Sequence, residues 1–248
     1  MRLLGIIGGS GLAQYPGLEI TEQKQVETPY GEPSAAIKMG TLNGKKVAFL
    51  PRHGDRHSIP PHRINYRANI HALKVIGVTD ILAVAAVGGI TDKYAPGVLS
   101  VPDQIIDYTY GREMTLFDDP AEPLVHVDFS WPFDSALRNG LKEKLAESEL
   151  KWNDGGCYAA TQGPRLETAA EITRLERDGC DIVGMTGMPE AVLARELALP
   201  YAMLSLVVNP AAGKSSHEIT MAEIEAVIHD GMANVCRVLA DFAGSYTA

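Results

Sequence analysis

Three segments of the chain are apolar almost without interruption, and each ends in a glycine-rich or polar loop. They are Leu3–Ile7, Asp80–Val87 and Tyr201–Val208. A continuous apolar run of this length predicts a β-strand that is covered on both of its faces, as in a mostly parallel sheet. We therefore expect these three strands to be buried between layers of other elements.

Between these strands, apolar residues recur with helical spacing. Gly77 ends the first predicted helix, and Thr168 with Glu171 forms the capping-box pair that opens a later one. The predicted helices are Arg63–Ile76, Asp134–Ser148, Thr168–Asp178, Pro189–Glu196 and Thr220–Phe242. Further strands are expected at Ala35–Met39, Lys46–Leu50, Leu99–Asp107, Gly156–Thr161 and Asp181–Met185, the first two flanking a hairpin signal at Asn43-Gly44. Strands that alternate with helices predict an α/β fold, and a length of 248 residues fits one domain spanning 1–248.

Composition narrows the class of protein. The chain has 22 Lys and Arg against 31 Asp and Glu, a formal net charge of −9, which argues against nucleic acid or an anionic membrane as a partner. A local cationic pocket for one small anion stays compatible with this balance. Three widely spaced cysteines favour reduced thiols over a disulfide framework. No stretch resembles a signal-peptide core or a transmembrane helix, so we expect a soluble, cytoplasmic protein.

Three familiar cofactor motifs begin in the sequence but are not completed. The third glycine of a dinucleotide fingerprint would fall at Gln14, and the first glycine of a phosphate-binding P-loop at Val208. The second histidine of a zinc motif would fall at Met221. We therefore expect neither a metal nor an organic cofactor, and a dinucleotide oxidoreductase is disfavoured.

Polar residues gather in loops that follow the predicted strands, which is where ligands bind in α/β sheets. Backbone N–H groups of Gly8–Gly11 and the Ser10 hydroxyl suit an anion, and Arg52 with His53 suits a phosphate. Each feature alone also fits a plain turn or a solvated loop, but together they favour a small oxyanion site. The five loops are Gly8–Leu12, Ala86–Gly89, Gln162–Glu167, Thr186–Met188 and Asn209–Gly213.

Several ordered motifs carry a resemblance over nearly the whole chain. They are IIGGSGL, PRHGDRH, VAAVGGI, QGPRLETAAE and GMTGMPEAVLARE. In this order they resemble the trimeric purine nucleoside phosphorylase superfamily, and most of all its methylthioadenosine phosphorylase branch. The resemblance implies a mixed central sheet flanked by helices, a homotrimer, and a purine nucleoside and inorganic phosphate as the two substrates.

The resemblance also implies roles for individual residues. Met185 is expected under the ribose, and His126 is expected to complete the site of a neighbouring subunit. The residues expected to hold phosphate are Ser10, Arg52, His53, Thr186 and the backbone around Ala85 and Ala86. Without the resemblance, Met185 and Thr186 would be interpreted as a core methionine and a helix cap at the end of a strand.

The residues expected around the base depart from the adenine-type pattern. Adenine-type members of this branch carry an Asp-x-Asp pair and a serine, where this chain has Asn209-Pro210-Ala211 and Leu166-Glu167. A 6-oxopurine offers an N1–H donor, which a carboxylate such as Glu167 accepts, and an O6 acceptor, to which the Asn209 amide donates. Alternative interpretations are an Asx turn at Asn209 and a first-turn helix charge at Glu167.

The sugar end of the expected site is apolar. Met221 and Ile224 lie three residues apart on one predicted helix face, in the stretch where ordinary 6-oxopurine enzymes place a histidine for the 5′-hydroxyl. A thioether wall suits a methylthio group, so 5′-methylthioinosine is the expected substrate. His217 nearby keeps inosine open, and methylthioadenosine and a nucleoside-binding module without catalysis are further alternatives. Phosphate held by Arg52 and His53 would attack the anomeric carbon while Asn209 stabilises the departing purine.

Overall fold

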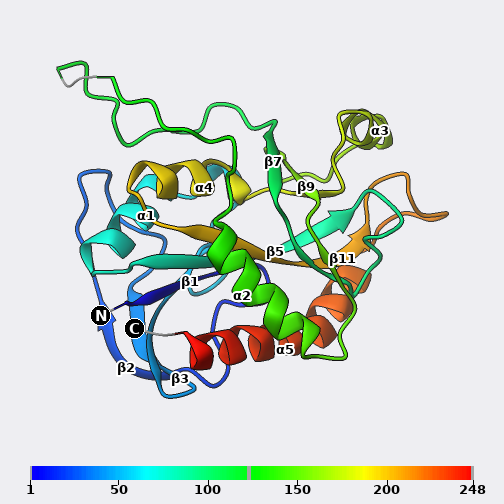
Figure 1. Ribbon diagram of the computed structural model, residues 1–248. Coiled ribbons are helices and arrows are strands. Elements are labelled where there is room, and N and C mark those ends of the chain that lie inside the picture. The colour runs from blue at the N-terminus through cyan, green and yellow to red at the C-terminus, as the bar shows by residue number, and fades with distance from the viewer. Residues whose placement is uncertain (1, 122–123, 247–248) are drawn as a thin grey trace.

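The centre of the molecule is a pair of long, buried strands, β5 (Asp80–Gly89) and β11 (Tyr201–Pro210), which run parallel to each other (Figure 1). The computed structural model, which describes residues 2–121 and 124–246, pairs β1 (Leu4–Gly8) with β5, also in parallel. These are the three continuous apolar segments, and all but two of their residues are buried. The prediction of strands covered on both faces is confirmed.

The remaining strands extend this centre into one mixed sheet. In the described part of the chain the sheet has eleven strands. Eight of them follow the order β2-β3-β4-β1-β5-β10-β9-β7. The other three branch from β5: β11 pairs with β5, β6 pairs with β11, and β8 pairs with β6. Parallel and antiparallel pairs both occur, because β10 is antiparallel to β5 while β1 is parallel to it. The added strands are β2 (Glu19–Lys24), β3 (Ile37–Leu42), β4 (Lys45–Pro51), β6 (Leu99–Val101), β7 (Gln104–Asp107), β8 (Trp152–Asp154), β9 (Cys157–Ala160) and β10 (Ile182–Gly184).

Helices cover both faces of the sheet (Figure 1). The helices are α1 (Tyr66–Val75), α2 (Ser135–Ala146), α3 (Ala169–Arg177), α4 (Gly187–Glu196) and α5 (Met221–Ser245). One apolar cluster packs α1 and α4 against one face, a second packs α2 and α5 against the other, and α3 closes a smaller cluster over β9 and β10. The expected single α/β domain with a mixed, helix-flanked sheet is confirmed. Among the described residues, no helix combines the length and the apolar character that crossing a membrane requires.

Several predicted boundaries are wrong for identifiable reasons. The segment Leu99–Asp107 forms two short strands, since Pro102 and Asp103 lie between β6 and β7. Helix α1 begins at Tyr66 and not at Arg63, because Asn65 caps it by accepting a hydrogen bond from the N–H of Ala68. By contrast, Asn43-Gly44 forms the predicted hairpin turn, with both residues at positive φ.

Candidate active site

A cavity of about 280 Å³ lies at the carboxyl ends of β1, β4, β5 and β11, and all five predicted loops contribute residues to it. It is lined by twelve residues that the sequence pointed to: Ser10, Arg52, His53, Ala85, Ala86, Leu166, Glu167, Met185, Thr186, Asn209, Met221 and Ile224. Segments from the two ends of the chain, such as those of Ser10 and Ile224, thus meet in one place. The parallel strands β1, β5 and β11 bring them together, because the carboxyl ends of parallel strands share one edge of a sheet.

The first loop approaches the sheet so closely that only glycine fits at its start. A Cβ atom at Gly9 would lie 2.4 Å from the carbonyl oxygen of Val84 and 3.1 Å from Nη1 of Arg52. Glycine at this position lets the Gly9-Ser10 backbone reach the cavity wall next to a guanidinium. The loop therefore offers an anion a hydroxyl and backbone N–H groups beside a positive charge.

Arg52 is fully buried, and its guanidinium forms a two-bond ion pair with the carboxylate of Glu190. Its Nε and Nη2 atoms donate to Glu190 Oε2 and Oε1 at 2.6 and 2.7 Å, and Nη1 donates to the Val84 carbonyl at 2.8 Å. Burial disfavours the charged guanidinium, but the Glu190 carboxylate outweighs that cost and raises the pKa of Arg52. Within the described chain three of its five N–H groups have partners, which leaves one N–H on each Nη atom for a further acceptor.

Glu190 and Tyr201 were missed by sequence reasoning although they fix Arg52. The Tyr201 hydroxyl donates to Glu190 Oε1 at 2.8 Å, so the carboxylate accepts from both neighbours without access to solvent. The available signal was an acidic residue inside an otherwise apolar helical stretch, which implies a buried cationic partner.

His53 is held as a neutral imidazole. Its Nδ1 lies 2.8 Å from the Ile59 carbonyl, which can only accept, so Nδ1 carries the proton. Burial and the nearby Arg52 charge lower the pKa of His53 to about 4. At neutral pH the Nε2 atom is therefore an acceptor, suited to the O–H of a monohydrogen phosphate.

A second imidazole of the same loop lies beside this one. The ring centroids of His53 and His57 are 4.5 Å apart, and His57 Nε2 lies 3.4 Å from the Ser10 hydroxyl. The sequence motif contained His57, but no role was assigned to it. Its contact with Ser10 joins the two predicted anion loops directly.

Two polar groups face the cavity where the base is expected. Glu167 accepts a hydrogen bond from the Thr161 hydroxyl on Oε1 at 2.6 Å, and Asn209 Nδ2 donates to the Pro210 carbonyl at 2.6 Å. The pairing of β11 with β5 shifts register between Val207 and Asn209, and such a bulge lets consecutive residues Val208 and Asn209 both line the cavity. Thr161, which sequence reasoning missed, holds the Glu167 carboxylate in place.

Ala211 lies elsewhere than expected. Its N–H donates to the Gly89 carbonyl at 2.7 Å, and the residue is buried in the apolar cluster under α3. Ala212 lines the cavity instead. The prediction of Ala211 as a base contact is therefore corrected, because the chain turns inward there.

The end of the cavity where the sugar is expected is apolar. Met221 and Ile224 come from the first turn of α5, and Met221 is 62 % exposed at the rim whereas Ile224 is buried. His217 does not line the cavity; its Nε2 lies 3.0 Å from Glu223 Oε1 on the exposed side of the helix start. Met185 and Thr186, which lie between β10 and α4, also line the cavity.

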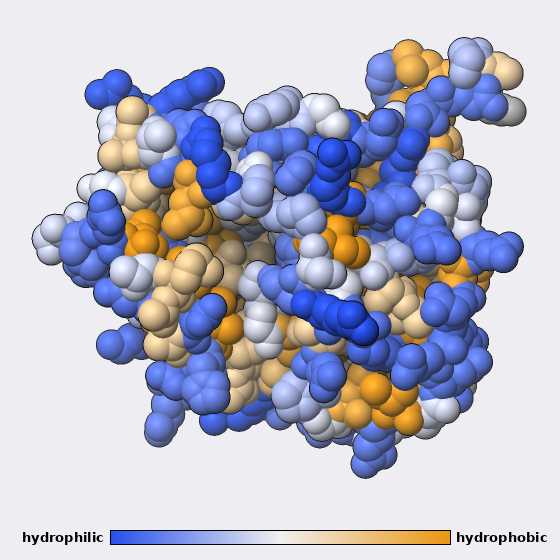
Figure 2. Space-filling view, turned by 180° about the vertical axis from the view of Figure 1, so that it is seen from behind, coloured by the Kyte–Doolittle hydropathy of each residue, from blue (hydrophilic) through white to orange (hydrophobic). Residues whose placement is uncertain are grey.

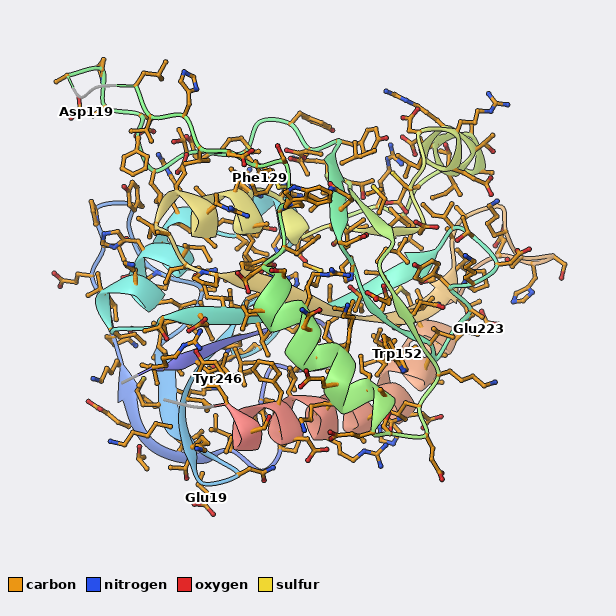
Figure 3. All side chains as sticks on the ribbon, in the orientation of Figure 1. Glu19, Asp119, Phe129, Trp152, Glu223 and Tyr246 are labelled. Carbon is orange, nitrogen blue, oxygen red and sulfur yellow. The ribbon has the colours of Figure 1, made fainter. Side chains whose placement is uncertain are left out.

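His126 is exposed and lies apart from the cavity of its own chain. It belongs to the long segment between β7 and α2, part of which projects from the body of the molecule with hydrophobic side chains on its surface (Figure 2). Asp119 of this segment and Glu223 of α5 lie at opposite ends of the molecule (Figure 3). His126 therefore has no place in the site formed by its own chain.

The fold and this cavity define an α/β protein whose cavity combines a buried guanidinium beside a serine hydroxyl, a carboxylate paired with an amide, and an apolar rim. Residues 3–243 match the family model described as the phosphorylase superfamily, and the chain belongs to that superfamily.

Particular relatives are similar over nearly their whole length. The chain is 57 % identical over 240 residues to the probable S-methyl-5′-thioinosine phosphorylase of Pseudomonas syringae pv. tomato, covering 97 % of this chain and 98 % of that one. It is 41 % identical over 244 residues to the 6-oxopurine nucleoside phosphorylase of Pyrococcus furiosus, covering 96 % and 91 %. The structure of methylthioadenosine phosphorylase from Schistosoma mansoni in complex with adenine superposes with a TM-score of 0.93 at 31 % identity, covering 98 % and 91 %.

Proposed function

We propose that this protein cleaves the N-glycosidic bond of 5′-methylthioinosine with inorganic phosphate, releasing hypoxanthine and 5-methylthioribose 1-phosphate. The observation that carries the proposal is the pairing of Glu167 with Asn209 in a cavity that also holds the two anion loops. The similarity to S-methyl-5′-thioinosine phosphorylases supports the same substrate.

The base end suits a 6-oxopurine by its donors and acceptors. The second oxygen of Glu167 accepts from N1–H, and the Asn209 amide donates to O6 or N7 as negative charge builds on the departing purine. A 6-aminopurine would bring its N1 lone pair against the carboxylate, which leaves two acceptors facing each other.

The phosphate end supplies the nucleophile. Ser10, His53, Thr186, the Ala85–Ala86 backbone and the two remaining N–H groups of Arg52 hold phosphate against the anomeric carbon, and Met185 packs under the ribose. As the glycosidic bond stretches, positive charge develops on the sugar and the phosphate stabilises it. Most of the rate enhancement then comes from holding the two substrates in line.

The sugar end favours a methylthio group over a hydroxyl. In the described part of the chain, the cavity wall around Met221, Ile224 and Ile219 brings no polar side chain to a 5′-hydroxyl, because His217 faces Glu223. A homotrimer, in which His126 of a neighbouring subunit completes each site, is part of this proposal.

A nucleoside panel with and without phosphate tests the function. We expect phosphate-dependent release of hypoxanthine from methylthioinosine, with kcat/KM above the values for inosine and methylthioadenosine. Equal release without phosphate would show a hydrolase, and binding without base release would show a non-catalytic module. A preference for methylthioadenosine would refute the assignment of Glu167 and Asn209.

A further inference from the structure

Arg112 lies outside the cavity, shortly after β7, and its guanidinium makes six hydrogen bonds. Nη1 donates to the carbonyls of Met185 and Met188 at 2.9 and 2.6 Å and to the Tyr66 hydroxyl at 3.2 Å. Nη2 donates to the carbonyls of Thr161 and Gln162 at 3.2 and 2.9 Å, and Nε donates to Gln162 Oε1 at 3.1 Å. Six acceptors share five N–H groups, so this side chain has nothing left with which to touch a substrate.

The acceptors belong to two different walls of the site. Thr161 and Gln162 begin the loop that carries Leu166 and Glu167 at the base end. Met185 and Met188 flank Thr186 on the wall proposed for ribose and phosphate. We call residues 161–167 the base wall and residues 185–188 the sugar–phosphate wall. The Arg112 guanidinium, which lies outside the cavity, forms hydrogen bonds to both walls.

A third connection runs through Tyr66. Its hydroxyl receives the Arg112 bond and donates to the Pro61 carbonyl at 3.0 Å, and Pro61 lines the cavity near His53. The Arg112 side chain also lies over the Tyr66 ring, 5.5 Å from its centroid. Sequence reasoning gave no hint of this role, because Arg112 lies in a polar segment without periodicity.

The chemistry of these contacts is specific to arginine. All six acceptors are neutral oxygens, and Arg112 forms no ion pair within residues 2–121 and 124–246. A planar fork can reach carbonyls on two loops at once, whereas a lysine ammonium has three N–H groups at one point. A charge-conserving replacement thus removes the geometry and keeps the charge.

We propose that Arg112 is a positioning residue that fixes the distance between the base wall and the sugar–phosphate wall. The inference rests on the proposed function, since it concerns how the two halves of one nucleoside are held against phosphate. If the two walls are not held at a fixed distance, each can still bind its part of the nucleoside, but the glycosidic bond is no longer aligned with phosphate. Loss of the fork therefore lowers kcat more than it raises KM.

The test compares Arg112→Lys with Arg138→Lys. Arg138 is a matched control because it also donates to two backbone carbonyls, those of Val101 and Pro102, and it is largely buried but lies on α2 away from the cavity. We expect Arg112→Lys to lower kcat by about 10- to 100-fold on folded protein, with a change in KM below about threefold. Arg138→Lys is expected to lower the melting temperature while kcat and KM stay at the wild-type values.

A second measurement does not depend on activity. Hydrogen–deuterium exchange should increase in Arg112→Lys in both the 161–167 and the 185–190 peptides, and in neither of them in Arg138→Lys. If the wild-type enzyme prefers another nucleoside, the proposed function fails while the exchange result still tests Arg112. Wild-type kcat in Arg112→Lys, or faster exchange in only one of the two peptides, would overturn the positioning role.

Discussion

At the scale of single residues, the proposed selectivity for the base depends on one carboxylate oxygen of Glu167. Thr161 donates to Oε1 of Glu167, so the other oxygen is the one available to an N1–H group. Glu167→Gln keeps an acceptor for Thr161 and puts an NH₂ group in place of the second oxygen. We expect kcat/KM for methylthioinosine to fall by about 100-fold or more, and the ratio of methylthioinosine to methylthioadenosine use to fall with it. Thr161→Val is the control, because it removes the hydrogen bond to Glu167 without changing the charge of the carboxylate. If Glu167→Gln leaves the ratio of methylthioinosine to methylthioadenosine use unchanged, Glu167 does not contact the base.

The neutral state of His53 predicts a pH dependence of stability. Its pKa is lowered to about 4 in the folded protein, mainly by burial, against 6.5 in the unfolded chain. Between these values the unfolded state binds a proton that the folded state does not, so the free energy of unfolding decreases as the pH falls from 6.5 to 4. The full contribution is about 3 kcal/mol at most.

Urea unfolding at several pH values in phosphate-free buffer measures this effect. His53→Asn should unfold with a shallower pH dependence over pH 4–6.5 than the wild type, because it removes one group that titrates only in the unfolded state. Parallel curves for the two proteins would mean that folding does not lower the pKa of His53.

At the scale of elements, the sequence was most informative where burial imposes a pattern. The strands β1, β5 and β11 are continuous apolar runs because helices cover both faces, and the Thr168–Glu171 capping box at the start of α3 forms as predicted. Strand β2 was missed because every residue but Lys24 is exposed, so it is held by backbone pairing with β3 and leaves no apolar alternation. Alternation of apolar and polar residues arises where one face of a strand is buried, so an exposed edge strand such as β2 lacks it.

The site was predictable where residues follow the ends of parallel strands, and not where they act through other residues. Ser10 and Arg52 closely follow β1 and β4, and Asn209 is the next-to-last residue of β11, so strand topology brings the three together. Glu190 and Arg112 do not line the cavity. Glu190 acts through Arg52, 138 residues away, and Arg112 acts through partners 46 to 76 residues away. Their neighbours follow from the packing of the whole chain, which local sequence does not encode.

At the scale of the whole molecule, the segment between β7 and α2 carries large apolar side chains that the described chain leaves exposed. Leu124 and Trp131 on it are 78 % and 70 % exposed, and neither packs in an apolar cluster of the described chain. Exposed large apolar side chains on a projecting segment are typical of a surface that another subunit covers. In the proposed homotrimer a neighbouring subunit would cover this surface and receive His126 from it.

Mixed trimers test that arrangement directly. His126→Ala leaves the cavity of its own chain intact, and Asn209→Ala impairs the cavity while leaving His126 available to a neighbour. In any trimer that contains both chains, head-to-tail order creates one site with an intact cavity and a neighbouring His126, so about one third of the sites should work. Co-expression with two tags and tandem purification isolates these trimers, and their activity should exceed that of either parent. If the mixed trimers are no more active than the parents, His126 does not complete a neighbour's site. Full activity of His126→Ala alone would show that His126 has no role in the reaction. A monomeric mass in solution would refute a site shared between subunits.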